Sequence, residues 1–240
     1  MLQVIHEQFD QFDQFDHLFN MLSPRFYFRR CNIQFLFKKK MAENIPFIRS
    51  FYEATKPLFV YGQNKFLEEL NPKGGETICE IGCGNGNNLI KLFKRNQNLK
   101  LIGFDYSASI IKATTERIKS RGLEKNIKLV SGLANEYQFE EQIDRFIFSY
   151  SLSAIPRPKE VLINVFQQLP PGGTVHIVDF GKFDWWPTLV KSPLIGFLSL
   201  FQVFPEPNIT EIFEQKKECK VEIERQLGGY SFLAVLRRGL

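Results

Sequence analysis

Three glycines separated by single residues follow an apolar, β-branched segment at residues 77–81. They are Gly82, Gly84 and Gly86. Glycine is needed where the backbone turns sharply against a ligand, because a Cβ would occupy the ligand's space. The pattern G-x-G-x-G differs from the G-x-G-x-x-G of dinucleotide-binding loops, whose third glycine helps to seat a pyrophosphate. The loop therefore suits a nucleoside with an amino-acid tail. Glu80 can accept a hydrogen bond from the ammonium group of that tail, directly or through water. A glycine-rich turn without a ligand is the structural alternative.

A second acid ends the next apolar segment, LKLIGFD at residues 99–105. Asp105 is placed to accept hydrogen bonds from both hydroxyls of a ribose, in the crevice at the carboxyl ends of parallel strands. Ser107 is the expected N-cap of the helix that follows. Helix capping alone is the structural alternative for Asp105.

Segments of strand composition alternate with segments of helical periodicity from residue 77 onward. We expect helices at 85–96, 107–122 and 158–169, and strands at 77–84, 99–105, 126–132, 143–152, 172–181, 216–226 and 229–238. This alternation predicts βαβ units and a parallel, doubly wound sheet. The last two strands are joined by Leu227-Gly228-Gly229, which is typical of a hairpin. The expected fold is α/β, with a seven-stranded sheet that is parallel except for a C-terminal antiparallel hairpin.

The composition is that of a globular protein with a mild excess of positive charge. The 240 residues include 31 Lys and Arg against 26 Asp and Glu, a formal net charge of +5. This excess suits an anionic membrane surface or an acidic ligand, but falls short of the concentrated basic field of a nucleic-acid-binding protein. The four cysteines form no cluster with histidines, so we expect no metal site and a reducing compartment. No apolar run reaches the ~20 residues of a membrane-spanning helix.

Residues 1–40 differ in composition from the rest of the chain. They contain the triplet repeat QFDQFDQFD and end in Lys38-Lys39-Lys40, directly before Met41. A period of three matches neither a helix nor a strand. Two interpretations stay open: translation begins at Met41, or the segment is a partly ordered helical arm, basic and aromatic enough to contact a membrane. The predicted organisation is an unmatched extension at 1–40 and one α/β domain at 41–240.

The segments EIGCGNG (80–86), FD (104–105) and LPPGGTVHIVDFG (169–181) resemble the class I S-adenosylmethionine-dependent methyltransferases. The resemblance covers about 77–180 and implies a Rossmann-like fold with S-adenosyl-L-methionine as cofactor. In that family an acid commonly follows the third strand beside the adenine. Leu133 stands at this position here, so the adenine amino group needs another acceptor or only packing. The resemblance places the cofactor against Glu80, Gly82, Cys83, Gly84, Gly86, Asp105, Tyr106, Leu133, Ala134 and Ser149, with Tyr52 and Tyr61 from the segment upstream.

A narrower resemblance covers nearly all of residues 47–240. The segments FYEATKPLFVYGQNKFLEELNP (51–72), SYSLSAIP (149–156) and GGYSFLAVLRR (228–238) are similar to the methyltransferases of betaine-lipid synthesis. Those enzymes methylate the amino group of diacylglyceryl-homoserine three times, giving diacylglyceryl-trimethylhomoserine. The resemblance implies a lipid amine substrate and an N-terminal helical lid at about 45–72. Lys56 and Gln63 stand where arginines are expected. Lys56 keeps the positive charge but would bind a carboxylate more weakly than arginine, and Gln63 carries no charge.

The residues after the fourth strand argue against a nucleic-acid acceptor. The amino methyltransferases of nucleic acids in this class carry an Asn/Asp-Pro-Pro-aromatic motif there, and this chain has SYSLSAIP. Two alternatives to the betaine lipid stay open. One is methylation of another small molecule, a phospholipid amine or a quinone. The other is a non-catalytic S-adenosylmethionine-binding protein, which the presence of acceptor-side segments beside the cofactor loop disfavours.

Repeated N-methylation makes the acceptor cationic, so its site should combine aromatic faces with a carboxylate. Tyr150 and Asp179, at the ends of the fourth and fifth strands, are predicted to position the acceptor, with Tyr52 and Tyr61 as candidates from the lid. No general base is required, because the amine loses its proton to water before each transfer. Packing is the alternative for the lid tyrosines, and capping or an ion pair for Asp179. We expect His176 in the core or on a sheet face rather than as a base.

An aromatic and apolar stretch follows the fifth strand. Trp185-Trp186-Pro187 leads into residues 189–204, flanked by Lys182 and Lys191. It suits the headgroup region of a membrane, with the tryptophans at the interface, or equally a core helix on the sheet. The expected location is cytoplasmic, free or peripheral on the inner face of the membrane. The expected partners are the membrane surface and the enzyme that makes diacylglyceryl-homoserine, and no nucleic acid.

Overall fold

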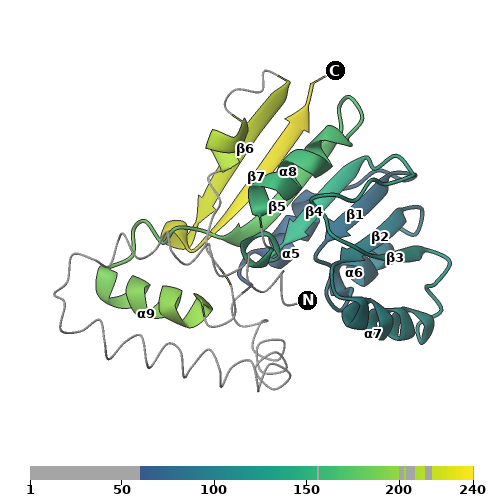
Figure 1. Cartoon of the computed structure of the whole chain (residues 1–240), viewed down its shortest axis with the longest axis horizontal. Helices are drawn as coiled ribbons and strands as arrows, with labels where there is room; N and C mark the ends of the chain where they lie inside the picture. Colours follow the sequence, from purple (N-terminus) through teal and green to yellow (C-terminus); the bar gives the residue numbers. More distant parts are fainter. Residues whose placement is uncertain (1–59, 156, 200–202, 204–208, 214–217, 240) are drawn as a thin grey trace. The chain divides into compact units, whose positions relative to one another are not determined.

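The computed structural model describes residues 60–155, 157–199, 203, 209–213 and 218–239 (Figure 1). The chain divides into two units, Met1–Pro57 and Leu58–Leu240, and the described residues all belong to the second. The predicted extension at 1–40, the predicted lid up to residue 59 and Tyr52 lie outside the described residues.

Seven strands form one sheet in the order β3-β2-β1-β4-β5-β7-β6. The first five pair in parallel, and β7 pairs antiparallel with both β5 and β6. This confirms the predicted α/β, Rossmann-like sheet with a C-terminal antiparallel hairpin. The strands are β1 (Thr77–Ile81), β2 (Lys100–Asp105), β3 (Ile127–Ser131), β4 (Arg145–Ser149), β5 (Thr174–Phe180), β6 (Cys219–Gln226) and β7 (Ser231–Arg238).

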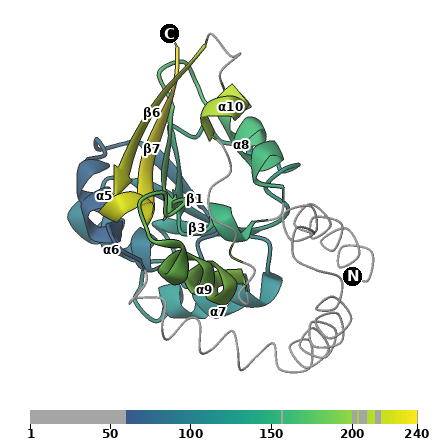
Figure 2. The same cartoon turned by 90° about the vertical axis from the view of Figure 1, so that its left-hand side faces the viewer.

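Helices cover both faces of the sheet. Figure 2 shows α5 and α6 on one side and α8 and α10 on the other. None of the helices in the described ranges is long and apolar enough to cross a membrane. The helices are α5 (Gln63–Glu69), α6 (Asn87–Arg95), α7 (Ala108–Lys119), α8 (Pro158–Gln167), α9 (Thr188–Ser199) and α10 (Ile209–Phe213), with short 3-10 turns η1 (Leu152–Ala154) and η2 (Leu227–Gly229).

The helix starts and turns follow local sequence signals. The Ser107 hydroxyl accepts a hydrogen bond from the Ile110 backbone N–H at 3.4 Å, which confirms it as the N-cap of α7. Pro158 occupies the first turn of α8, where its missing N–H costs no helical hydrogen bond. In the turn between β6 and β7, Gly228 has φ +63° and Gly229 φ +84°, conformations that glycine adopts without strain.

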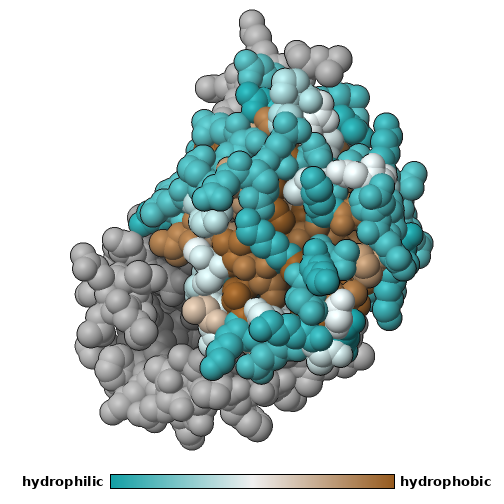
Figure 3. Space-filling model, turned by 90° about the vertical axis from the view of Figure 1, so that its right-hand side faces the viewer, coloured by the Kyte–Doolittle hydropathy of each residue, from teal (hydrophilic) through white to brown (hydrophobic). Residues whose placement is uncertain are grey.

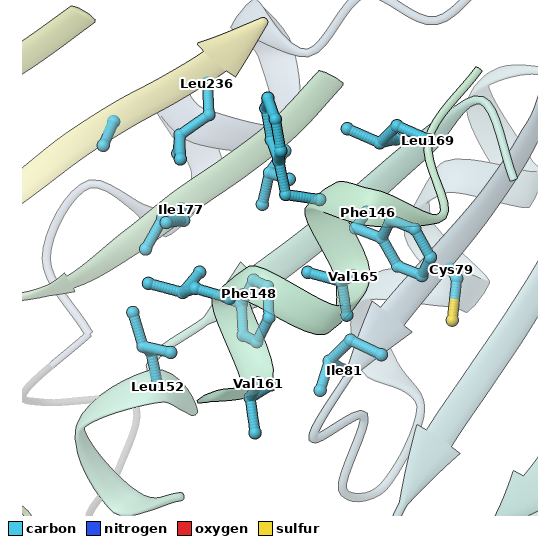
Figure 4. Close-up of a cluster of buried hydrophobic side chains, with 14 of the residues drawn as sticks. Cys79, Ile81, Phe146, Phe148, Leu152, Val161, Val165, Leu169, Ile177 and Leu236 are labelled. Carbon is cyan, nitrogen blue, oxygen red and sulfur yellow. The ribbon is translucent and has the colours of Figure 1, made fainter. Parts of the chain in front are cut away.

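The core lies between the sheet and α8. Figure 4 shows Phe148 of β4 beside Val161 and Val165 of α8, with Phe146 further along the strand. All five residues of β1 and all seven of β5 are buried, as expected for central strands covered on both faces. Seen from the β3 side, hydrophilic side chains surround a central apolar area (Figure 3). In the sheet, β2, β1, β4 and β5 are neighbours, so their carboxyl ends lie along one edge, and the candidate site lies at those ends.

Candidate active site

The glycine loop between β1 and α6 is held against β2 by its own backbone. The N–H groups of Gly82 and Cys83 both donate to the Phe104 carbonyl, at 2.8 and 3.0 Å. Gly82, Gly84 and Gly86 have φ of +73°, +52° and +71°. A Cβ at Gly82 would lie 2.5 Å from the Ser151 Cβ, whereas a Cβ at Gly84 would meet nothing within 4 Å. Gly82 is therefore required by packing, and Gly84 leaves open space where a ligand can approach the backbone.

Helix α7 supports the same loop from outside. The Thr114 hydroxyl donates to the Gly84 carbonyl at 2.7 Å. Arg117 donates to the Asn85 carbonyl at 2.7 Å and to the Asn87 side chain at 2.5 Å. Neither residue was predicted from the sequence, although their spacing of three places them on one face of the helix. They hold the loop in the shape that leaves Gly84 open.

Asp105 lies at the end of β2 with its carboxylate fixed in place. One oxygen accepts from the Gly84 N–H at 3.2 Å and the other from the Ser107 N–H at 3.0 Å. A carboxylate oxygen can accept more than one hydrogen bond, so each keeps capacity for a ligand hydroxyl. The side chain is 6% exposed, which limits competition from water. Its position beside the open space at Gly84 fits a ribose.

Two exposed apolar side chains follow the ends of β2 and β3. Tyr106 is 69% exposed and Leu133 is 53% exposed, values unusual for large apolar residues. Ala134 follows Leu133 and packs partly against the core. The Gly132 N–H donates to the Asp105 carbonyl at 3.2 Å, which ties the two strand ends together. These side chains can contact the faces of an adenine, which fits the predicted cofactor. The acid that commonly follows the third strand in the family is absent, because Leu133 stands in its place.

Glu80, at the end of β1, is anchored by the first turn of α6. The Asn88 side-chain amide donates to a Glu80 carboxylate oxygen at 2.6 Å, and both residues are buried. Asn88 was not singled out from the sequence. Burial also raises the pKa of Cys83 well above its ordinary value, so this thiol stays protonated beside Glu80.

The loop after β4 meets the segment before α5. The Tyr150 hydroxyl donates to the Tyr61 carbonyl, and the Gln63 side chain donates to the Ser149 hydroxyl at 2.9 Å. Tyr150 has φ +51°, a left-handed conformation that is strained for a tyrosine. Its N–H donates to the Val178 carbonyl at 2.8 Å, which holds this conformation. Gln63, which departs from the arginine expected by resemblance, thus joins the predicted lid to the strand end.

The buried ring of Tyr150 packs against Phe180 at the carboxyl end of β5, and Phe180 in turn packs against Tyr230. The centroids of Tyr150 and Phe180 are 4.8 Å apart in an edge-to-face arrangement, and Phe180 lies 5.9 Å from Tyr230. Burial raises the pKa of Tyr230 to about 12, so its ring stays neutral. Sequence reasoning missed Tyr230, because the register of the hairpin decides which residue faces Phe180. We refer to Tyr150, Phe180 and Tyr230 as the aromatic cluster.

Asp179 points into the protein. It is fully buried, and its oxygens accept from the Ser153 N–H at 3.0 Å, the Ser153 hydroxyl at 2.5 Å and the Phe180 N–H at 2.7 Å. Burial raises the pKa of its carboxyl, and these hydrogen bonds act in the opposite direction. This carboxylate is turned toward Ser153 inside the protein and does not reach the surface. It positions the loop that carries Tyr150, so any influence on an acceptor would pass through that loop.

His176 lies within β5, with its Nε2 3.0 Å from the Thr174 hydroxyl. Burial, with a smaller contribution from Arg145 and Arg237, lowers the pKa of His176 from 6.5 to about 3. The imidazole is therefore neutral at physiological pH. It lies in the middle of β5, opposite Ile147 of β4, and not at the carboxyl end of the strand. The expectation of a core or sheet-face histidine agrees with this position.

We expect His176 to reduce stability on acidification. Between pH 6.5 and about 3 the unfolded chain binds a proton that the folded imidazole does not, so stability falls as pH falls through 6.5. The loss should be roughly 2 kcal/mol between pH 7 and pH 5, at about 1.4 kcal/mol per pH unit. Urea unfolding at pH 7 and pH 5 measures the free energy of unfolding at each pH. His176→Gln should lose the part of the pH dependence that comes from this imidazole. Equal slopes for both proteins would contradict the prediction.

Gly84→Ala should weaken binding of S-adenosylhomocysteine about tenfold, a change of ~1.4 kcal/mol, because its Cβ enters the space expected for the cofactor. Gly122→Ala is the matched control, since Gly122 has φ +67° and also nothing within 4 Å of an added Cβ. The left-handed backbone costs each variant about 1–2 kcal/mol of stability. Thermal unfolding should therefore show similar losses, and calorimetric titration a loss of affinity in Gly84→Ala alone. Equal affinities would contradict the role given to Gly84.

Comparison with known proteins agrees with this geometry. A family model described as a methyltransferase domain matches residues 72–223. The chain is 28% identical over 147 residues to a demethylmenaquinone methyltransferase of Lactobacillus johnsonii, which covers 60% of this chain and 57% of that protein. It is 29% identical over 128 residues to a tRNA N(3)-methylcytidine methyltransferase of Schizosaccharomyces pombe, covering 50% and 42%. The chain thus spans about half the length of these relatives.

Among solved structures, the fold is similar to phosphoethanolamine N-methyltransferase 2 of Haemonchus contortus in complex with S-adenosyl-L-methionine. The TM-score is 0.59 at 22% identity, over 69% of this chain and 39% of that one. The names of the three proteins give different acceptors, and all three describe methyltransferases. Because the family model spans more than half of the chain and contains the glycine loop and Asp105, the chain belongs to the S-adenosylmethionine-dependent methyltransferases, with S-adenosyl-L-methionine as its cofactor.

Proposed function

We propose that this methyltransferase methylates the amino group of diacylglyceryl-homoserine, up to three times, to give diacylglyceryl-trimethylhomoserine. The observation that carries the proposal is the position of Tyr150 at the carboxyl edge of the sheet, where its buried ring packs on Phe180 with centroids 4.8 Å apart and its hydroxyl contacts the segment before α5. Aromatic faces attract a methylated ammonium without needing its N–H groups, so they serve an acceptor that loses those groups during the reaction.

The chain's residues supply binding and orientation. Asp105 and the loop around Gly84 hold the cofactor, which supplies an electrophilic methyl group on sulfur. Transfer is an in-line displacement, so the rate depends mainly on holding a neutral amine about 3–3.5 Å from that carbon. Tyr150 orients the amine, and the contact of its hydroxyl with the Tyr61 carbonyl positions the segment that helps to exclude water. The proton leaves to water before each transfer, and the neutral, buried His176 takes no part.

The acceptor-side segments further support a lipid amine. Residues 149–155 form the end of β4 and the turn that carries Tyr150, and GGYSFLAVLRR at 228–238 contributes Tyr230 to the aromatic cluster. Both segments carry the resemblance to betaine-lipid methyltransferases. A nucleic-acid acceptor is not proposed, because the segment after β4 lacks the motif that would hold a base. The proposed partner is the enzyme that makes diacylglyceryl-homoserine, because it supplies the substrate.

A quinone is the second candidate acceptor. It is favoured by the 28% identity to a demethylmenaquinone methyltransferase, although the chain covers only 57% of that protein. A quinone ring can also stack on aromatic side chains. The two candidates differ in the atom methylated, carbon against nitrogen, and therefore in their products.

The deciding experiment offers the purified full chain both acceptors. Isotope-labelled S-adenosylmethionine is supplied with a lipid extract that contains diacylglyceryl-homoserine, and separately with demethylmenaquinone, and labelled products are identified by mass spectrometry. We expect mono-, di- and trimethylated betaine lipid, and none with Asp105→Ala. Labelled menaquinone alone would replace the proposal by the second candidate. Binding of S-adenosylhomocysteine without any product would indicate a non-catalytic binding protein.

A further inference from the structure

The exposed large apolar side chains of the described residues fall into two groups. Tyr61 precedes α5, and Tyr106 and Leu133 follow β2 and β3 at the expected cofactor site. The other four, which we call the Trp185 surface, follow β5 or lie in the β6–β7 turn: Trp185, Leu189, Val190 and Leu227, with exposed fractions of 84%, 90%, 50% and 52%. Concentrated exposure of this kind marks an interaction surface, because isolated apolar residues are seldom so open together.

Hydrogen bonds hold the members of the Trp185 surface together. The Trp185 N–H donates to the Gly228 carbonyl at 3.2 Å, and the Trp186 indole donates to the Leu227 carbonyl at 3.0 Å. Leu189 and Val190 begin α9, where the Val190 N–H donates to the Pro187 carbonyl at 2.9 Å. Figure 1 shows α9 beyond the turn that joins β6 and β7. The apolar side chains are thus presented by an ordered backbone.

A continuous line of rings joins this surface to the candidate acceptor site. It begins with the aromatic cluster and continues from Tyr230 to Phe183 and Trp186, at centroid distances of 5.6 and 5.8 Å. The Phe183 N–H donates to the Gly229 carbonyl at 2.8 Å, so the line follows the same sheet edge. Tyr150, Phe180 and Phe183 are only 2%, 1% and 0% exposed, so these rings pack inside the protein and fix the Trp185 surface to the carboxyl edge of the sheet.

The charges near the surface favour an anionic bilayer over another protein face. Lys182 and Lys191 flank the tryptophan segment, the nearby Arg225 and Asp184 offset each other in an ion pair at 3.6 Å, and the whole chain carries +5. Basic side chains next to exposed Trp and Leu are typical of proteins that lie on a membrane interface.

We infer that the Trp185 surface docks on an anionic lipid bilayer, which would bring the carboxyl edge of the sheet next to a lipid acceptor. The inference rests on the proposed function for the identity of the lipid. Docking itself is independent of methyl transfer and can be measured without substrate.

The experiment measures sedimentation of the full chain with vesicles of phosphatidylcholine, with and without phosphatidylglycerol. We expect binding that increases with phosphatidylglycerol, and roughly tenfold weaker partitioning for Trp185→Ala and for Leu189→Ser. Leu133→Ser is the control, since it removes another exposed leucine, 53% against 90% for Leu189, just after β3 on the opposite edge of the sheet. The control should partition like the unmodified chain. Trp185→Ala and Leu189→Ser should bind S-adenosylhomocysteine normally, which shows that they fold.

Absence of vesicle binding, or equal loss in all three variants, would overturn the inference. A dimer in sedimentation velocity that Trp185→Ala abolishes would identify a second copy of the chain as the occupant, and would overturn it too. Methylation of detergent-dispersed lipid without vesicle binding would leave the proposed function standing and remove the docking surface. Vesicle binding that depends on Leu189, without methylation of any lipid, would leave the docking surface standing and remove the proposed function.

Discussion

Replacing Asp105 by alanine is expected to weaken S-adenosylhomocysteine binding by about a hundredfold or more. The carboxylate is 6% exposed and already oriented by the Gly84 and Ser107 N–H groups. Each hydrogen bond from a ribose hydroxyl to a charged acceptor contributes about 1.5–3 kcal/mol, so loss of two removes about 3 kcal/mol or more. At about 1.4 kcal/mol per factor of ten, this gives the expected loss. Isothermal titration calorimetry measures it directly.

Two further variants separate binding from folding. Asp105→Asn keeps the shape and one acceptor oxygen, so it should bind with intermediate affinity and unfold at nearly the native temperature. Glu116→Ala removes one negative charge from the exposed face of α7 and should leave affinity unchanged. An Asp105→Ala protein that is folded by circular dichroism and binds S-adenosylhomocysteine normally would remove Asp105 from the cofactor site.

The fold and the cofactor loop were predictable because their signals are local. Runs of β-branched residues between helical segments predict buried parallel strands, and Ser107 predicts the start of α7. Glycines at positions 82, 84 and 86 have left-handed φ, which other residues adopt only with strain. Each of these features depends on a few neighbouring residues, so a single sequence contains the required information.

The supporting contacts of the site were not predictable, because they join residues far apart in the chain. Arg117 reaches Asn85, and the Tyr150 hydroxyl reaches Tyr61. For Asp179, the difficulty is different. All seven residues of β5 are buried, so alternation along the strand does not tell which face a side chain occupies. Only the tertiary structure shows that Asp179 binds Ser153 inside the protein.

Tyr150 combines backbone strain with a position beside the expected acceptor. A non-glycine residue at φ +51° is strained, and such strain persists where surrounding contacts fix it. The Val178 carbonyl, the Tyr61 carbonyl and the Phe180 ring supply those contacts. The side chain therefore has one defined orientation at the carboxyl edge of the sheet, which is what a residue that positions a substrate requires.

Tyr150→Ala is expected to slow the second and third methyl transfers two- to thirty-fold, so that mono- and dimethylated lipid accumulate. The ring should hold the increasingly cationic head group, and one cation–π contact contributes about 0.5–2 kcal/mol, which converts to that range of rates. Affinity for S-adenosylhomocysteine should change little, because no contact to the cofactor loop is lost. Mass spectrometry of the lipid products over time measures the three stages.

Tyr150→Phe is the matched variant that separates the ring from the hydroxyl. It keeps the aromatic face beside Phe180 and loses only the hydrogen bond to the Tyr61 carbonyl. Both variants keep a non-glycine residue at φ +51°, so backbone strain is the same in each. If the ring holds the cation, Tyr150→Phe forms trimethylated lipid at nearly the normal fraction. An unchanged trimethyl fraction in Tyr150→Ala would instead show that Tyr150 only packs. The cation would then have to be held by Phe180, Tyr61 or Tyr52, each testable by the same product analysis.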